Sequence, residues 1–393
     1  MSDQAIPPAF PPQLMRQPPQ ARLDYFKTYT VAHPALRLAD QAVWNALREP
    51  AGASLVFVFG PPGVGKTPLL AQVEKRLLAL MPEERERGHF PVLRLDAVSP
   101  ALSHFQWGDY YQRALVLLQD PFVQYTVDYR RYLPLVTRTT LAREPLSRMR
   151  VTDTAALRLI FERTLQLRKP RAILIDDAEH IAKAARGSKL LDQLDHVKSL
   201  ASMTKTVHVL VGTYDLLVVR NLSAQLSRRS VDVHFSRYRA SNESELRAFK
   251  SVLWAFQRNL PLEQEPDLLR DWEYCYERTV GCVGVLKDWL TRVLAEAMEK
   301  GETTISGGLL EQHALSVDRC DQMMTEALAG ETALTEDDNA AYRLRVRLGL
   351  EHGPAQQQGQ GSAKGQASSF PRQSQRVGQR KPQRDPVKNS ERA

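Results

Sequence analysis

The residues from Ser54 to Leu70 read SLVFVFGPPGVGKTPLL and divide into three parts. Residues 54–59 form an apolar run rich in Val and Phe, which is typical of a buried strand. A glycine-rich loop follows, and from Leu69 an apolar-rich stretch continues as a predicted helix. A strand before and a helix after are the setting in which G-x-x-x-x-G-K-[ST] predicts a phosphate-binding loop, or P-loop.

The chemistry of this loop suits a nucleotide. Its glycines let the backbone bend so that successive N–H groups point at phosphate oxygens, and the helix N-terminus adds partial positive charge. We expect Lys66 to reach the β- and γ-phosphates and the Thr67 hydroxyl to coordinate Mg²⁺. The loop residues predicted to bind the nucleotide are Gly60, Pro61, Pro62, Gly63, Val64, Gly65, Lys66, Thr67 and Pro68.

The composition favours a cytoplasmic protein with a hydrophobic core. The chain has 393 residues, 43% of them hydrophobic, which is enough for two domains or one elaborated domain. Three cysteines are too few for a disulfide framework. No apolar run approaches membrane-spanning length, and the N-terminus lacks the apolar stretch of a signal peptide, so no membrane partner is expected.

The positive charge is concentrated in one segment. The formal net charge is +8, and residues 353–393 hold eight Lys and Arg against two acidic residues. The tail therefore carries +6 and the other 352 residues only +2. For this reason the net charge alone does not establish that the folded part binds nucleic acid.

The chain divides by composition into four predicted parts. Residues 1–22 are rich in Pro and Gln and are expected to be disordered, as is the basic tail, residues 351–393. Between them we predict an α/β core over residues 23–240 and a helical lid with one further helix over 241–350.

Further strands are predicted within residues 90–96, 171–177, 206–212 and 221–235, giving an α/β fold with a five-stranded parallel sheet. Residues 99–152 are too long for a simple connection. Their aromatic side chains recur at helix-like intervals, which favours the core of a small helical insertion over a platform for stacking bases.

Residues 171–177 read RAILIDD, an apolar strand that ends in two acids. Downstream of a P-loop this is the Walker B pattern, although such an Asp can also simply cap the next helix. We expect Asp176 to hold Mg²⁺ through water, and Asp177 or Glu179 to orient the attacking water. Many ATPases have Glu where Asp177 stands, and the shorter Asp predicts slow hydrolysis unless Glu179 takes the role.

Other candidates surround this centre. Thr213 follows a predicted strand and can sense the γ-phosphate. Lys287, near the start of a predicted lid helix, would face the nucleotide. Arg228 and Arg229 either reach a neighbouring subunit's nucleotide as arginine fingers or are surface charge. Adenine contact is expected near His33 and Pro34, with Tyr29 and Val31, where ordinary packing is the alternative.

Taken in order, these motifs resemble the AAA+ ATPases over about residues 23–328. The local sequence is most similar to that of the transposon-encoded ATPases TniB and TnsC, relatives of MuB. The segments that carry this resemblance are GPPGVGKT, LIDDAEHI, LVGTYDLL, QLSRRSVDVHF and TVGCVGVLKDWL. The resemblance implies ATP and Mg²⁺ as cofactors and hydrolysis to ADP and phosphate. It also implies homo-oligomeric rings or filaments on double-stranded DNA, at the nucleoid, that link a target selector to the transposase. The selector would be a protein or an RNA-guided complex.

By position, the resemblance makes Asp177 the water-orienting acid, Thr213 the first sensor and Lys287 the second. DNA contacts in such proteins fall in loops before the Walker B strand, which here points to Arg143, Arg148 and Arg150. Such contacts go to phosphates and are salt-dependent. The alternative is a nucleotide-switched signalling or secretion-associated ATPase that acts only on protein partners; a replication-type loader is a third and weaker reading.

Overall fold

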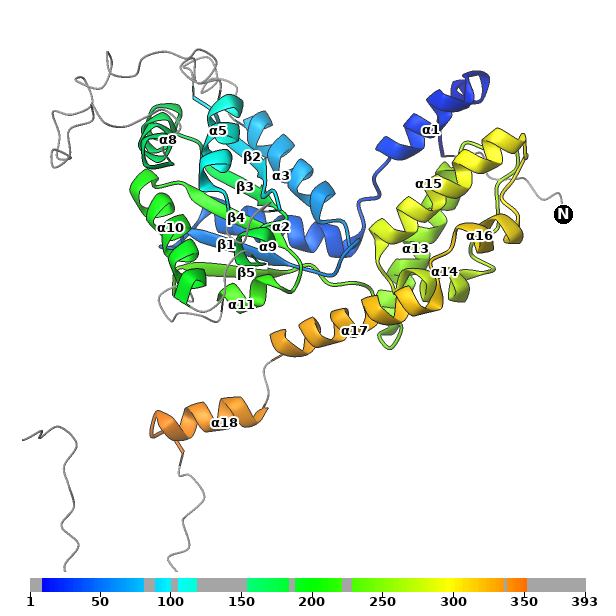
Figure 1. Ribbon diagram of the computed structural model, residues 1–393. Coiled ribbons are helices and arrows are strands. Elements are labelled where there is room, and N and C mark those ends of the chain that lie inside the picture. Colours follow the sequence, from blue (N-terminus) through cyan, green and yellow to red (C-terminus); the bar gives the residue numbers. More distant parts are fainter. Residues whose placement is uncertain are drawn as a thin grey trace, which may run out of the picture. The chain divides into compact units, whose positions relative to one another are not determined.

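The computed structural model is described for most of the chain, which forms two units, Met1–Thr335 and Glu336–Ala393 (Figure 1). The described residues are 9–80, 89–99, 105–118, 154–183, 188–220, 228–335 and 338–351, with the backbone alone at 182–183, 188–194, 219–220 and 338. The predicted DNA contacts, Arg143, Arg148 and Arg150, lie outside the described residues, as does the tail from residue 352 onward.

A five-stranded parallel sheet lies at the centre of the first unit, in the order β2-β3-β4-β1-β5. The strands are β1 (Leu55–Phe59), β2 (Val92–Asp96), β3 (Ala172–Asp176), β4 (Val207–Gly212) and β5 (Ser230–His234). Every residue of β1, β3 and β4 is buried. Strands covered on both faces read as continuous apolar runs, which is why the sequence located them. The predicted fold class, α/β with a five-stranded parallel sheet, is confirmed.

The strand register brings the functional segments to one edge of the sheet. Phe59 is paired with Gly212 of β4, and Asp96 with Asp176 of β3. Because all the strands run in the same direction, the P-loop after β1 lies beside the residues that end β3 and follow β4.

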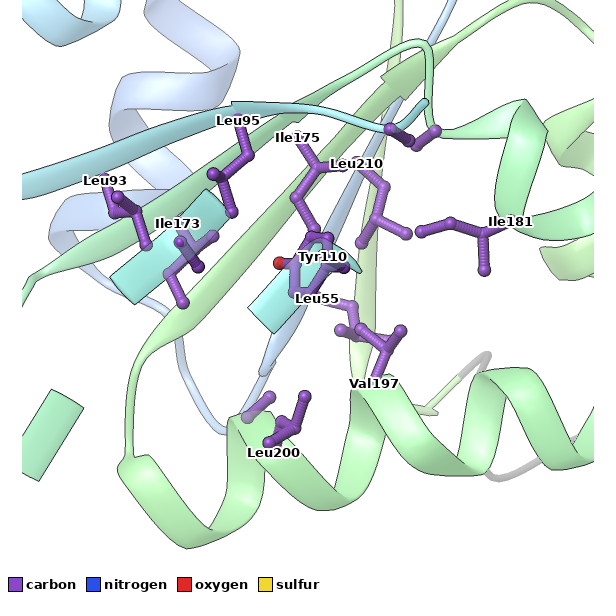
Figure 2. Close-up of a cluster of buried hydrophobic side chains, with 14 of the residues drawn as sticks. Leu55, Leu93, Leu95, Tyr110, Ile173, Ile175, Ile181, Val197, Leu200 and Leu210 are labelled. Carbon is purple, nitrogen blue, oxygen red and sulfur yellow. The ribbon is translucent and has the colours of Figure 1, made fainter. Parts of the chain in front are cut away.

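Helices cover both faces of the sheet. On one face, α2 (Pro34–Arg48) and α3 (Lys66–Leu80) pack on the alternate β1 residues Val56 and Val58. On the other, the helices that cover Leu55, Phe57 and Phe59 are α5 (Trp107–Leu117), α8 (Thr154–Arg168), α9 (Glu179–Lys183), α10 (Ser188–Thr204) and α11 (Leu216–Arg220). Figure 2 shows Tyr110 among Leu55, Ile175 and Leu210 in this second layer.

The aromatic residues near the start of the predicted insertion are part of this main core. Tyr110 and Tyr111 are buried against Phe161 of α8, and Tyr111 is 0% exposed. Residues 105–118 therefore do not form a separate insertion or a base-stacking platform, and the rest of the predicted insertion, residues 119–152, lies outside the described residues. Helical spacing showed correctly that α5 has an apolar stripe, but spacing alone does not say which surface the stripe covers.

The expectation that residues 1–22 are disordered is wrong for residues 9–22. They contain a 3₁₀ helix, η1 (Pro12–Arg16), and the first turn of α1 (Pro19–Thr28). Each helix begins with a proline, which is favourable there because the first helical N–H needs no partner and proline fixes φ. Phe10 is buried, and the Ala9 amide donates to the carbonyl of Arg258 at 3.1 Å.

The helices after β5 enclose a second core. They are α13 (Glu243–Asn259), α14 (Trp272–Thr279), α15 (Val283–Lys300) and α16 (Gly307–His313), and α17 (Val317–Leu334) follows and contacts α14. Phe249, Leu286 and Trp289 lie in this core together with Phe26 of α1. The Asn242 side chain caps α13 by accepting from the amides of Ser244 and Glu245. In the second unit, α18 (Asp338–Arg347) matches the helix predicted within residues 335–350. Within the described ranges, no helix has the length and apolar content needed to cross a bilayer.

Acid is expected to destabilise this fold through two buried histidines, His33 and His208, and the half-buried His196. Burial lowers the pKa of His33, His196 and His208 to about 4 each, against an ordinary value of 6.5. The unfolded chain therefore binds more protons than the folded chain below pH 6.5. The contribution of these neutral histidines to the free energy of unfolding is full above pH 6.5. It falls by roughly 1.4 kcal/mol per pH unit for each histidine as the pH is lowered toward 4. Urea unfolding at pH 7.5, 6.0 and 5.0 measures it, and an unchanged midpoint across that range would contradict the account.

Candidate nucleotide-binding site

The P-loop connects β1 to α3 and depends on its glycines. Gly63 and Gly65 have φ values of +72° and +113°, in the left-handed region that side chains rarely adopt. A Cβ on Gly60 would stand 2.3 Å from the carbonyl oxygen of Phe235. The backbone therefore takes the curved path that the sequence predicted.

Lys66 lies over its own loop. Its Nζ donates to the carbonyls of Gly60 and Pro61 at 3.0 and 2.9 Å. Burial lowers the pKa of Lys66, while the nearby carboxylates of Glu179 and Asp176 act in the opposite direction. The carboxylates favour the charged amine, which is the form needed to bind phosphate.

Thr67 and Asp176, the two predicted Mg²⁺ ligands, meet at the sheet edge. The Thr67 hydroxyl donates to Asp176 Oδ2 at 2.9 Å, and the amide of Asp177 donates to Oδ1 at 3.1 Å. Burial raises the pKa of the Asp176 carboxyl, an effect that the Thr67 hydrogen bond opposes. A hydroxyl and a carboxylate side by side next to a P-loop are the oxygen ligands that Mg²⁺ prefers, so these residues fit the ion.

Asp177 and Glu179 differ in their surroundings. Glu179 begins α9, is 5% exposed, and its Oε2 accepts from the amide of Thr213 at 3.3 Å. A Cβ at Gly212 would stand 2.2 Å from this oxygen, so glycine leaves room for the carboxylate. Asp177 is exposed and has a φ of +50°. Glu179 is therefore the more firmly positioned of the two acids.

Thr213 follows β4 directly. Its Oγ1 is buried and has no hydrogen-bond partner within the part of the chain that the structure describes. A buried hydroxyl without a partner is costly, so this atom is suited to a ligand oxygen.

All of these groups border one cavity of about 610 Å³, which is within the usual size range of ligand pockets. Residues of three regions line it: the segment after α1, the P-loop with the carboxyl ends of β3 and β4, and the helices after β5. The lining residues are Lys27, Tyr29, Thr30, Val31, His33, Leu36, Pro62, Gly63, Val64, Gly65, Lys66, Thr67, Pro68, Asp176, Asp177, Glu179, Thr213, Phe256, Val283, Gly284, Lys287 and Asp288.

Of the predicted base contacts, His33 lines this cavity with Tyr29 and Val31, whereas Pro34 is not among the lining residues. The Nδ1 atom of His33 accepts from the Tyr238 hydroxyl at 2.9 Å and, more weakly, from the Leu36 amide at 3.4 Å, which caps α2. Pro34 is the first residue of α2. His33 therefore has a structural role as well as a place in the wall.

The first turn of α15 lies directly against the P-loop. The amide of Val285 donates to the Gly63 carbonyl at 3.1 Å, and a Cβ on Gly284 would stand 2.5 Å from that oxygen. Lys287 lines the cavity, but its ammonium donates to the carbonyl of Phe26 and lies 3.6 Å from the centre of that ring. Burial lowers the pKa of Lys287 to about 7.

Arg228 and Arg229 lie at the opposite edge of the sheet. β5 begins at Ser230, which is in register with Leu55 at the start of β1. The P-loop is one strand length away, or roughly 16 Å at about 3.3 Å per residue. Both side chains are exposed, and Arg229 donates to the Ser202 hydroxyl at 3.3 Å. Their role as fingers for a neighbouring subunit stays a prediction.

Several residues at or beside the site were not predicted from the sequence. Arg94, in the middle of β2, has its Nη2 3.7 Å from Asp176 Oδ2 and its Nη1 3.5 Å from Glu74 Oε2. An arginine inside the otherwise apolar FPVLRLD was the available signal. Phe256 and Asp288 also line the cavity, but that depends on how distant helices pack, which no local pattern reveals.

Residues 48–219 match the family model of an AAA domain. Solved structures with similarity include Aeropyrum pernix ORC2 with ADPNP and ADP (14% identity, TM-score 0.46, covering 75% of this chain and 71% of that one). A second is a Walker-type ATPase of Pyrococcus abyssi (14% identity, TM-score 0.42, covering 83% and 81%). A third is Aeropyrum pernix ORC1 in complex with DNA (16% identity, TM-score 0.44, covering 74% and 68%).

The comparison with curated proteins found no match. The family match spans the P-loop, the Asp176 strand and β4, which are the segments that meet at the cavity. Residues 48–219 are therefore similar to an AAA domain, and they lie in an α/β fold with a five-stranded parallel sheet of the kind found in AAA+ P-loop ATPases.

Proposed function

We propose that this chain binds ATP with Mg²⁺ in the cavity and hydrolyses it to ADP and phosphate. The observation that carries the proposal is the 2.9 Å contact of Thr67 with Asp176, beside the buried amine of Lys66. These groups come from two segments more than 100 residues apart, and together they supply what a nucleoside triphosphate needs. When bound, Mg²⁺ neutralises phosphate charge.

The residues at the phosphate end have separate roles. Lys66 and the loop amides bind the β- and γ-phosphates, and Thr67 and Asp176 hold the ion. The free hydroxyl of Thr213 donates to a γ-phosphate oxygen. Glu179 is placed to accept a proton from the attacking water, because its carboxylate lines the same cavity and is fixed by the Thr213 amide.

The base end of the nucleotide is assigned to the wall after α1. Tyr29, Val31 and Leu36 give this wall an apolar surface, and His33 adds a ring that burial keeps neutral, since its pKa is lowered to about 4. Apolar walls with few polar groups are typical of sites that bind planar bases.

We further propose that the ATP-bound protein oligomerises on double-stranded DNA and links target selection to a transposase. The support is the five short sequence segments that resemble those of the TniB and TnsC ATPases. One of them, QLSRRSVDVHF, ends in β5 and places Arg228 and Arg229 at the edge opposite the P-loop. That edge suits contacts to the next subunit of a ring or filament rather than to the chain's own nucleotide.

An ATPase that acts on protein partners alone is the alternative, and the aromatic residues of 99–152 slightly favour it. Of these residues, Phe105, Tyr110 and Tyr111 are buried in the α/β core and are not open to a partner. The modest charge of the folded part is what still favours it.

DNA binding in ATP should depend strongly on salt, and the slope tests the predicted contacts. If Arg143, Arg148 and Arg150 each neutralise a phosphate, replacing all three by Gln should reduce the slope of log K against log salt by about 2 to 3 units. Filter binding to a random-sequence duplex from 50 to 200 mM salt measures this.

The control is a variant with the same loss of charge at three exposed arginines of other regions: Arg48, Arg270 and Arg292, each changed to Gln. Equal slopes for the two triple variants would refute the assignment of Arg143, Arg148 and Arg150.

A further inference from the structure

Lys287 connects two segments that are far apart in the sequence. It lies in the second turn of α15, and its ammonium donates to the carbonyl of Phe26 in the last turn of α1. The rings of Phe26, Tyr29 and Phe256 surround it, with centres 3.6, 5.7 and 5.4 Å from Nζ. The amine is thus held on α1, at one end of the cavity wall.

The chemistry of this contact explains how a lysine is tolerated there. Burial disfavours the charged amine and lowers the pKa of Lys287 to about 7, with Asp288 acting in the opposite direction. The carbonyls of the last helical turn carry partial negative charge, which makes the Phe26 carbonyl a good acceptor for Lys287 in addition to the Tyr29 amide, which donates to it at 3.2 Å. Attraction to the aromatic faces adds to it.

The contact fixes the segment that follows α1. This segment contributes Tyr29, Val31 and His33 to the cavity wall. A second set of bonds holds it from the same side: the Tyr25 hydroxyl donates to Asn259 Oδ1 at 3.0 Å, and Asn259 Nδ2 donates to the Tyr29 hydroxyl at 3.0 Å. The wall is therefore attached to the helices after β5, and Lys287 provides the charged attachment.

We propose that Lys287 is a positioning residue that holds the base-facing wall of the cavity, and that it sets affinity for the base end of the nucleotide. The inference rests on the proposed binding of ATP in this cavity. It assigns Lys287 a different task from sensing the γ-phosphate, which is what its place in the sequence suggested.

The two roles differ in which ligands they affect. A side chain that touches the γ-phosphate strengthens binding of ATP but not of ADP. A side chain that holds the base wall strengthens both alike, and leaves a ligand without a base unaffected. Tripolyphosphate is such a ligand, since it keeps the charge of ATP and lacks the nucleoside.

The test is calorimetric titration of the full-length Lys287→Met variant with ATP, ADP and tripolyphosphate, each with Mg²⁺. We expect ATP and ADP to bind about tenfold more weakly, as for the loss of one hydrogen bond to a charged group, and tripolyphosphate to bind as in the parent protein. The preference for ATP over GTP should shrink as well. The exposed Arg292→Met on the same helix is the matched control and should change nothing.

Loss of ATP affinity with ADP unchanged would overturn the inference in favour of γ-phosphate sensing, and unchanged binding of all ligands would also overturn it. Tyr25→Phe loosens the same segment by a single hydroxyl outside the cavity lining. It should weaken ATP and ADP together by about two- to fivefold, which keeps the test valid if Lys287→Met folds poorly. If the parent protein binds no ATP, the proposed function itself fails, which is a separate result.

Discussion

Replacing Glu179 with Gln is expected to slow ATP hydrolysis by about two to four orders of magnitude, the usual contribution of a general base. Glu179 is buried in the cavity like Asp176, but it is not a predicted Mg²⁺ ligand, and its Oε2 is held by the Thr213 amide. Gln has the same shape, and its side-chain oxygen can still accept that hydrogen bond. The substitution therefore removes the charge that takes the proton and leaves the packing intact, so ATP affinity should stay within about threefold.

The Asp177→Asn variant is compared with Glu179→Gln to decide which of the two acids acts as the general base. Asp177 is exposed, and its backbone amide already serves Asp176. We expect hydrolysis within about tenfold of the parent rate, because an exposed, unheld carboxylate contributes less as a base. Single-turnover hydrolysis with excess protein measures both variants. A severe loss in Asp177→Asn with a mild one in Glu179→Gln would show that the acid next to Asp176 is the base after all.

Replacing Lys66 with Ala should weaken ATP binding by at least about 100-fold. Lys66 is the buried amine at the P-loop, and two nearby carboxylates favour its charged form. A hydrogen bond to a charged group contributes about 1.5 to 3 kcal/mol, and an amine between two phosphates makes more than one. Titration with a fluorescent ATP analogue provides the measurement.

Lys75→Ala is the matched control, because Lys75 is exposed on the same helix, α3. It loses the same charge far from the loop and should bind ATP normally. If Lys66→Ala kept parental affinity, the cavity beside the P-loop would not be the nucleotide site.

The sequence located the phosphate end of the site because local rules decide its geometry. A P-loop needs glycines at fixed spacing, and parallel strands bring their carboxyl ends together. For this reason, the meeting of Thr67 with Asp176 and the place of Thr213 could be predicted.

The base-facing wall of the cavity, formed by the segment after α1, could not be predicted, because it depends on packing between distant segments. The prolines of residues 9–22 suggested disorder, although Pro12 and Pro19 are the first residues of helices. Without α1, the sequence offered no partner for Lys287 other than the nucleotide. Arg94 was missed for a similar reason, since its contact with Asp176 depends on the pairing of β2 with β3.

The central claim is that ATP controls assembly of this protein on DNA, and co-sedimentation with a random-sequence duplex tests it most directly. The full-length protein is compared with ATP, with ADP and without nucleotide, and the pelleted material is imaged by electron microscopy. The account predicts rings or filaments on DNA with ATP and little bound protein in the other two conditions. Equal binding in all three conditions, or ATP binding without assembly on DNA, would contradict it.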